Sequence, residues 1–529
     1  MRKHPYLIIP IILFLFLAFK TVEQSDRYFQ IVKSLDVFTT LFKEVNAYYV
    51  EEINPTELMK IGIDAMLSSL DPFTDYIPED DIEDYRTMTT GEYGGIGAIV
   101  EKKGGVNTVV MPYENAPAIR SGLLIGDQIL KINNIELNGK KAYEISNLLK
   151  SQINSQITLT IKRMDRSEIF EISLVTQKIV IKNVSYAGLI NRNLGYIKLT
   201  DFTTNAGKEV GEALKKLAKQ GAKKLILDLR GNPGGLLLEA INVANIFIPK
   251  GAEIVSTKGK LEEWTKIYST KNQSIDAKIP LVVLTDQRSA SAAEIVAGVI
   301  QDYDRGVLVG RKTYGKGLVQ QTRPLAYNAQ LKVTTAKYYI PSGRCIQAID
   351  YSTESSAKIP DSLKSTFRTS NGRAVLDGGG IDPDILIDPP KLSTVCYQLM
   401  QRNLIFNYAT KYYFEHNTLS NARNFQLSQS EFQQFLVWLE SQSFDYQTPL
   451  EFKLDEALDL AKTAVRGEQV YQRIMELNTL IQSEKKNDLV IYQDEIKRLL
   501  EQDIVSRYYL QEGIIEASFD SDPDILKAT

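Results

Sequence analysis

The chain has 529 residues, of which 43% are apolar and 24% charged, and its 62 Lys and Arg nearly balance its 65 Asp and Glu. This composition argues against a largely disordered chain, a collagen or a coiled coil, and the lack of a dense basic block argues against nucleic acid as a partner. The length predicts three or four domains.

Cysteine and histidine are too scarce for several kinds of site. Cys345 and Cys396 cannot build a disulfide framework or a cysteine-rich zinc site, and they form either one disulfide or two free thiols. The two histidines, His4 and His416, argue against Ser-His-Asp, Cys-His and multi-histidine metal sites, and His416 is expected to be a packed or surface residue. We therefore expect no metal and no cofactor, and the base of any hydrolase must be another residue type.

The N-terminal segment, residues 1–22, has the layout of a secretory signal. Arg2 and Lys3 precede an apolar run over residues 6–19, which Lys20 closes. No clear small-residue cleavage site follows, so removal of the segment and its retention as an inner-membrane anchor both stay open. By the positive-inside tendency, we expect the rest of the chain to be exported to the periplasm or cell envelope.

The spacing of apolar residues divides the rest of the chain into four regions. Helical spacing predicts an N-terminal helical region over residues 27–88, and short β-like runs predict a small β domain over 90–176. Strand-like and helical runs alternate over 177–392, which predicts an α/β layer structure, and helical spacing returns over 395–529. The clearest predicted strands are 96–100, 108–111, 128–132, 156–162, 223–229 and 281–284, and the clearest predicted helices are 236–247 and 292–300.

A glycine-rich loop precedes the first strand of the small β domain. Its consecutive backbone amides can form a nest for a carboxylate, and the strand edge can pair with an extended peptide, although a tight hairpin has the same composition. Together with the Ser-Gly-Leu-Leu segment that begins at Ser121, the loop resembles a bacterial PDZ domain over about residues 90–175. The resemblance implies that Gly95, Ile96 and Gly97 bind the carboxylate of a C-terminal peptide; a PDZ domain can equally be a scaffold.

A serine follows the predicted strand 281–284. Ser291 would begin a helix, where unpaired amides and the helix dipole favour both an attacking alkoxide and the oxyanion that it creates. Ser291 and Glu294 also have the spacing of a capping box, so this segment alone does not distinguish a nucleophile from a structural cap.

A lysine and a glutamine lie four residues apart in a second glycine-flanked segment. Lys316 could act as a general base only if burial or neighbouring charges lowered its pKa, and Gln320 could then hold its amine by a hydrogen bond. The alternative is an exposed lysine in a glycine turn.

The predicted strand 223–229 ends in a rigid, glycine-rich turn over residues 228–235. Such a turn presents backbone amides, but this one lacks the Gly-Lys-Ser/Thr ending of a phosphate loop. We favour an oxyanion hole built from Gly234 or Gly235 together with Ala292.

Several separated motifs, in this order, resemble the carboxy-terminal processing peptidases, the tail-specific serine proteases of family S41. The motifs are residues 70–72, the PDZ-like region, 228–235, 289–294, 313–320, 338–347 and 378–384. The resemblance implies an α/β, crotonase- or ClpP-like protease core with an inserted PDZ domain, an N-terminal helical segment and a C-terminal helical domain. It also implies that Ser291 is the nucleophile, Lys316 the general base and Gln320 its orienting partner.

These observations predict an exported endopeptidase that recognises protein or peptide C-termini and cleaves by Ser-Lys acyl transfer. We expect a homo-oligomer, with or without an adaptor protein, and a region 395–529 that governs assembly or substrate access rather than chemistry. That region should bury its apolar face against the protease core or a second subunit. The alternatives are a catalytically silent PDZ adaptor that delivers C-termini to another protease and a ligand-binding or acyl-CoA-type protein of related fold.

Overall fold

The computed structural model describes residues 8–351, 357–389, 391–463, 467–485 and 487–529, with the backbone alone for residues 8–25. The chain divides into two compact units. One contains the residues up to Tyr76 together with Leu331–Val333, and the other contains Ile77–Gln330 and Thr334–Thr529.

The first unit is helical, as its apolar spacing predicts. It contains α1 (Ile8–Tyr48) and α2 (Pro55–Ser68), and the side chain of Asn54 caps α2 by accepting hydrogen bonds from its first free amides. Arg2 and Lys3 of the predicted secretory signal lie outside the described residues. Within the described ranges, no helix is both long enough and apolar enough to cross a membrane.

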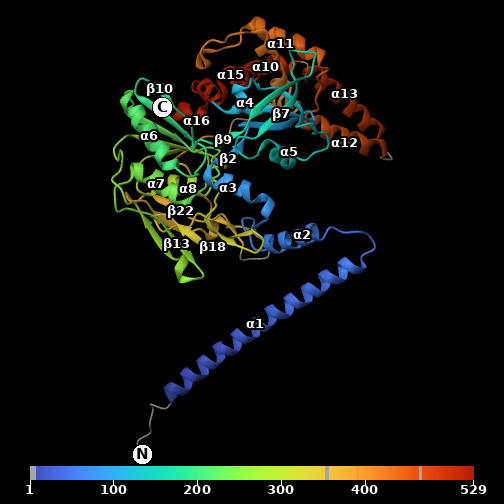
Figure 1. The fold of residues 1–529 in the computed structure, drawn as a ribbon. Coiled ribbons are helices and arrows are strands. Elements are labelled where there is room, and N and C mark those ends of the chain that lie inside the picture. Colours follow the sequence, from blue (N-terminus) through green and yellow to red (C-terminus); the bar gives the residue numbers. More distant parts are fainter. Residues whose placement is uncertain (1–7, 352–356, 390, 464–466, 486) are drawn as a thin grey trace, which may run out of the picture. The chain divides into compact units, whose positions relative to one another are not determined.

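The second unit contains a six-stranded sheet in the order β10-β11-β12-β15-β16-β23, in which the strands from β11 onward are parallel and β10 is antiparallel to β11. Figure 1 labels β10, an edge strand of this sheet, and the helices α6, α7 and α8. Three helices lie between its strands in the sequence. The strands are β10 (Val184–Asn191), β11 (Leu194–Leu199), β12 (Lys224–Asp228), β15 (Leu281–Thr285), β16 (Val307–Gly310) and β23 (Ile385–Leu386), and the helices are α6 (Ala206–Lys219), α7 (Leu237–Phe247) and α8 (Ala292–Asp302). The predicted α/β region is therefore confirmed.

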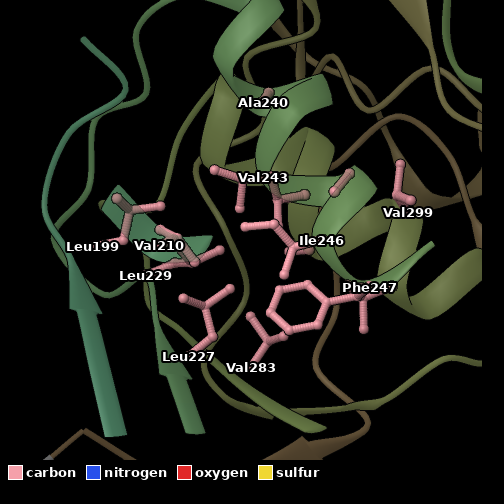
Figure 2. Packing of buried hydrophobic residues seen from close by; sticks show 14 of the residues in the cluster. Leu199, Val210, Leu227, Leu229, Ala240, Val243, Ile246, Phe247, Val283 and Val299 are labelled. Carbon is pink, nitrogen blue, oxygen red and sulfur yellow. The ribbon is translucent and has the colours of Figure 1, made fainter. Parts of the chain in front are cut away.

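Alternate residues of the central strands point to opposite faces of this sheet. Leu227 of β12 and Val283 of β15 belong to a fully buried cluster with the three helices, and Figure 2 shows them beside Phe247 of α7. Their neighbours Ile226 and Leu284 are equally buried but belong to a cluster on the other face. Because both faces are covered, these strands are continuously apolar, which is the pattern from which they were predicted.

The end of the chain covers the second face of the sheet. Helices α15 (Gln493–Ser518) and α16 (Pro523–Ala528) contribute Ile515 and Ile525 to the cluster there, and the ring of Phe519 lies 5.2 Å from that of Tyr196 on β11. The C-terminal region therefore buries apolar residues against the α/β region, which is one of the two partners that we predicted for it. Its last residues, among them Ile515, Phe519 and Ile525, form part of the hydrophobic cluster on this face of the sheet.

A second, five-stranded sheet contains four strands that lie wholly or mostly in this unit. These are β13 (Glu253–Gly259), β14 (Lys266–Ser269), β17 (Leu318–Pro324) and β18 (Gln330–Tyr339). The pairing of β13 with β14 and of β13 with β18 is antiparallel. Tyr338, near the end of β18, is fully buried, and its hydroxyl contacts the carbonyl oxygens of Ser291 and Lys316.

The small β domain is a sheet in the order β3-β4-β5-β7-β8, covered on one face by a helix. Its elements are β3 (Ala98–Lys103), β4 (Val106–Pro112), β5 (Gln128–Ile132), β6 (Ile135–Glu136), α5 (Ala142–Leu149), β7 (Gln156–Lys162) and β8 (Phe170–Val175). The ends predicted for β5 and β7 are correct. Strand β3 begins two residues later than predicted because Gly97, with φ of 74°, makes a turn that a strand cannot contain.

The C-terminal region is helical and has a hydrophobic core of its own. Its other helices are α9 (Thr394–Gln401), α10 (Leu404–Glu415), α11 (Gln429–Ser441), α12 (Pro449–Thr463), α13 (Glu468–Lys485) and α14 (Asp488–Ile491). Phe432, Phe435 and Leu439 are buried in this core at the helical spacing that predicted it. Histidine His416 stacks on Tyr412, with ring centres 3.8 Å apart, and is therefore a packed residue.

Both cysteines are free thiols, which settles the alternative that the sequence left open. Cys396 is buried in the core of the C-terminal region, whereas Cys345 is half-buried in the segment that follows β18. Burial raises the pKa of both thiols, and that of Cys396 reaches about 11, so both are protonated at neutral pH.

Candidate active site

Ser291 occupies a sharp turn between β15 and α8. It is the residue before the helix, half-buried, with φ of 52° and ψ of −112°. A non-glycine residue in such a conformation costs about 1–3 kcal/mol, which the surrounding structure must offset, and such strain is concentrated at functional sites. The turn presents Ser291 at the N-terminal end of a buried helix, where the helix dipole favours negative charge.

Two buried side chains hold this turn in place. Asp286 accepts hydrogen bonds from the amides of Arg288 and Ser289, and its Oδ1 also accepts one from Gly231 of the neighbouring turn at 2.9 Å. The hydroxyl of Ser289 donates to the carbonyl of Leu229 at the end of β12. Ser289 is completely buried and bonded into the scaffold, so it is a structural residue and not a second candidate nucleophile.

The glycine-rich turn after β12 lies directly against Ser291. A Cβ atom built at Gly234, where φ is 99°, would lie 2.8 Å from Cβ of Ser291 and 2.9 Å from the amide nitrogen of Ala292. The carbonyl of Asn232 accepts a hydrogen bond from Ala290, which ties the two turns together. The close approach explains why the turn contains glycine at this position.

The hydrogen bonds of the two turns show which of the predicted oxyanion-hole amides are already bonded and which have no acceptor. The amide of Gly234 donates to Oδ1 of Asn232 at 2.8 Å, which removes it from the candidates. The amides of Gly235 and Ala292 have no acceptor within the described part of the chain. Two unpaired amides beside a serine at a helix start can bind an oxyanion.

Lys316 lies in the turn before β17, and Gln320 lies on that strand. Lys316 is half-buried, between the buried residues Gly315 and Gly317. The side-chain nitrogen of Gln320 donates to Oγ1 of Thr334 at 3.1 Å, which orients the amide. The side-chain oxygen is then the atom of Gln320 with the chemistry to accept a hydrogen bond from an amine.

A single carboxylate fixes the backbone of both predicted catalytic residues. Oε2 of Glu294 accepts hydrogen bonds from the amides of Ser291 and Lys316, each at 2.8 Å. Oε1 accepts from Gly315 at 2.7 Å and from the hydroxyl of Thr313 at 2.5 Å. The nitrogens of Ser291 and Lys316 can therefore lie no farther apart than twice 2.8 Å.

Glu294 is completely buried, and burial raises the pKa of its carboxyl to about 7. The hydrogen bonds from Thr313, Lys316, Gly315 and Ser291 oppose this rise because they favour the ionised form. The sequence predicted only the cap of α8 by Glu294, and the spacing of Ser291 and Glu294 contained no signal that the same carboxylate would also bind the segment 313–316.

The hydroxyl of Tyr338 joins the same two residues from their carbonyl side. It donates to the carbonyl oxygen of Lys316 at 2.5 Å and lies 3.2 Å from that of Ser291. Burial raises the pKa of Tyr338, so the hydroxyl remains protonated and able to donate. The serine and lysine segments are thus held together at both their amide and carbonyl groups.

A buried charge cluster connects the glycine-rich turn to the end of the chain. Asp228 is fully buried; burial alone would raise its pKa, but Lys198 and Arg230 hold it below the usual range. The guanidinium of Arg230 binds Asp228 and also reaches Asp522 and Asp524, at 2.8 Å each. The sequence contained no signal for this pairing, because its partners lie almost 300 residues apart.

The predicted carboxylate loop of the β domain has two amides without a partner. In the residues that the structure describes, the amides of Ile96 and Gly97 donate to no acceptor, although the carbonyls of both residues accept hydrogen bonds from Ala118 and Tyr113. Strand β3, which follows the loop, is the first in the sheet order and pairs with β4 alone among the described strands. The loop can therefore receive a carboxylate, and the strand edge an extended peptide.

Comparison with known families assigns three parts of the chain. Residues 94–174 match the PDZ domain, residues 193–354 match "Peptidase family S41", and residues 395–529 match "Probable PDZ-protease, C-terminal helical domain".

Relatives of known name agree with these matches. The "Carboxy-terminal-processing protease" of Bartonella bacilliformis is 36% identical over 62% of this chain and 75% of its own length. The "Probable CtpA-like serine protease" of Staphylococcus aureus is 32% identical over 68% of this chain and 66% of its own length. Among solved structures, the "Photosystem II D1 C-terminal processing protease" is similar over 68% of this chain and 96% of that one, with 26% identity and a TM-score of 0.36.

Proposed function

Since the chain belongs to the S41 family of carboxy-terminal processing serine proteases, we propose that it is an exported endopeptidase that cleaves by Ser-Lys acyl transfer. The observation that supports this mechanism most directly is the pair of hydrogen bonds by which Glu294 holds the amides of Ser291 and Lys316. Such a clamp holds the backbone of a nucleophile close to that of a base, and an adjacent base is one of the ways in which a serine is activated.

In the proposed reaction, the neutral amine of Lys316 accepts the proton of the Ser291 hydroxyl. The oxygen of Ser291 then attacks the peptide carbonyl carbon, and the carbonyl oxygen becomes an oxyanion that accepts hydrogen bonds from Gly235 and Ala292. The ammonium of Lys316 returns the proton to the leaving amine as the C–N bond breaks. Water, deprotonated by the same lysine, hydrolyses the acyl-enzyme and restores the serine. In this scheme Gln320 orients the amine.

We assign the selection of substrates to the PDZ domain. The unpaired amides of Ile96 and Gly97 would bind the terminal carboxylate, with Gly95 completing the loop. The substrate tail would then extend along the free edge of β3 as an added strand. A main-chain interaction of this kind selects for a free C-terminus more strongly than for a sequence.

Hydrolysis of an unstructured substrate protein by purified variants tests the mechanism. Ser291→Ala and Lys316→Ala should each reduce kcat by about a thousandfold or more, because the two residues act as a unit. Lys312→Ala removes a lysine of the same segment, whose partner is Asp382, and should leave most of the activity. Wild-type protein that binds tails but cleaves none would instead support the PDZ adaptor.

Export and assembly are also part of the proposal. The basic start and apolar run of residues 1–22 support export, which fractionation of cells producing the full chain would test. The exposed apolar side chains Ile31, Leu35 and Phe38 on α1 support a homo-oligomer. Light scattering should give a mass above that of one chain, and Leu35→Glu should lower it; a monomeric wild type would contradict this part.

A further inference from the structure

A cavity of about 430 Å³ lies between the sheet of the PDZ domain and helix α10 of the C-terminal region. Its PDZ side is formed by the ends of β3, β4, β5 and β7, and its other side by residues 402–410. Five cationic side chains line it, and no Asp or Glu is among the described residues that do so. The cations are Lys103, Lys162, Arg163, Arg166 and Arg402.

Three of these five cations have a carboxylate partner, and two do not. Arg163 is paired with the buried Asp127 at 2.6 Å, Lys103 lies 3.2 Å from Glu101, and Arg166 lies 3.9 Å from Asp165. Lys162 and Arg402 are exposed, and neither makes an ion pair with a carboxylate in the described part of the chain. A concave surface with this charge attracts anions.

The two walls of the cavity are in direct contact. A Cβ atom built at Gly126 of the PDZ domain would lie 2.5 Å from Cγ2 of Thr410 on α10. The centre of the Phe406 ring lies 5.6 Å from the amine of Lys103 and 4.4 Å from the guanidinium of the buried Arg507. The cavity therefore exists before any ligand binds, and the C-terminal region forms half of it.

The cavity lies at the far end of the strand that we propose for substrate binding. The carboxylate loop precedes β3, so a bound tail must run antiparallel to β3, with its upstream residues toward Lys103. A peptide paired along the whole of β3 would reach Lys103 about six residues before its C-terminus. The residues just upstream of that point would enter the cavity.

We propose that this cavity is a specificity site for acidic residues of the substrate tail, at about positions five to eight from its C-terminus. The proposal rests on the proposed binding of C-termini by the PDZ domain and adds a substrate class to it: proteins whose apolar C-terminus follows a short acidic segment. It also gives the C-terminal region a role in substrate selection.

The test uses the full chain with Ser291→Ala, which cannot turn over the peptide, and fluorescence anisotropy of labelled decapeptides. The peptides share four apolar C-terminal residues and carry either Glu or Gln at positions five to eight, each as a free acid or an amide. The Glu free acid should bind about three- to tenfold more tightly than the Gln free acid, and 0.5 M salt should remove the difference.

Two variants assign the effect to the cavity. Lys162→Gln combined with Arg402→Gln should remove the preference for Glu, whereas Lys219→Gln, an exposed lysine on α6, should not. The reversal Lys162→Glu with Arg402→Glu should favour a peptide that carries Lys at the four positions.

The outcomes distinguish the two proposals. Equal binding of the Glu and Gln free acids, with both amides weaker, would overturn the acidic site and leave the PDZ assignment intact. Equal binding of acids and amides would overturn the carboxylate loop and, with it, the register on which the acidic site depends. A Glu preference that survives in both cavity variants would also contradict the assignment.

Discussion

The backbone nitrogens of Ser291 and Lys316 donate to the same oxygen atom, Oε2 of Glu294, at 2.8 Å each. The two residues lie 25 positions apart in the sequence and on different elements, so this shared acceptor limits the separation of the two backbone segments that bear the proposed nucleophile and base. The hydroxyl of Tyr338 closes the other side by binding their carbonyl groups. Catalysis by this chain should therefore depend on residues that never contact the substrate.

Glu294→Gln should reduce kcat by about a hundredfold or more with little change in KM. In the glutamine side chain, an NH₂ group replaces one of the two carboxylate oxygens. This group is a donor, and it would face the backbone N–H groups or the hydroxyl that now donate to Glu294. The clamp would therefore break and leave buried donors unpaired. Steady-state hydrolysis measures the effect. Glu171→Gln, on the exposed face of β8, is the matched control, and comparable activity of the two variants would contradict the role of the clamp.

Activity should fall as the pH falls through about 7. The pKa of Glu294 is raised to about 7, so below this pH the carboxyl becomes protonated and loses one of the acceptors that hold Ser291 and Lys316. A base that must be deprotonated acts in the same direction. A profile of kcat that is flat between pH 5 and 8, with acylation rate-limiting, would contradict both the effect of Glu294 and the need for a deprotonated base.

The effect of Glu294 on stability should have the opposite pH dependence to its effect on activity: its contribution to the unfolding free energy should fall as the pH rises. A carboxyl whose folded pKa lies above its unfolded value binds its proton more tightly when folded, so its contribution falls as the pH rises from about 4.5 to 7. Over this pH window, the unfolding free energy of the wild type should fall by on the order of 1–3 kcal/mol more than that of Glu294→Gln. Thermal denaturation of both proteins at several pH values would measure this, and parallel curves would be inconsistent with a raised pKa.

Gly234→Ala should abolish most activity and lower the stability by about 1–3 kcal/mol, because it adds a methyl group 2.8 Å from Cβ of Ser291 and strains a residue with φ of 99°. Gly105→Ala is the matched control: its φ is also positive, at 85°, but nothing lies within 4 Å of the added carbon. If both variants lose stability equally and both retain activity, the close approach has no catalytic importance.

Asp522→Asn together with Asp524→Asn should reduce kcat about tenfold or more and lower the stability by about 2–4 kcal/mol. Both carboxylates bind Arg230, which belongs to the turn that presents Gly235, and Asp524 is buried against Arg230 and Arg311. Asp520→Asn, which breaks an exposed pair with Arg423 instead, should be nearly neutral. Unchanged kinetics of the double variant would separate the end of the chain from catalysis.

Truncation near Lys391 tests how far the C-terminal region can be separated from the protease core. It removes Ile515, Phe519 and Ile525 from one face of the central sheet, so the truncated protein should unfold or aggregate. The measurement is circular dichroism and light scattering of the truncated protein beside the full chain. A truncated chain that remains folded and active would contradict this prediction and would leave the C-terminal region with a role in assembly or substrate access alone.

Local patterns predicted the elements of the core and the two turns that bear the site. The apolar runs of β12 and β15 and the helix that begins at Ala292 were found within two residues, because strands buried on both faces are continuously apolar and the Ser291–Glu294 capping spacing marks the start of the helix. Long-range contacts left no such signal. The binding of Arg230 to Asp522, and the second role of Glu294, depend on side chains that only the folded chain brings together.

Intact-protein and peptide mass spectrometry after reaction with a serine-reactive phosphonate would test the Ser-Lys mechanism most directly. We predict one adduct per chain, on the peptide that contains Ser291, and at least a hundredfold slower labelling of Lys316→Ala at neutral pH, with Lys312→Ala unaffected. An adduct on a different serine, or equal labelling rates for the wild type and Lys316→Ala, would contradict the proposal that Lys316 activates Ser291.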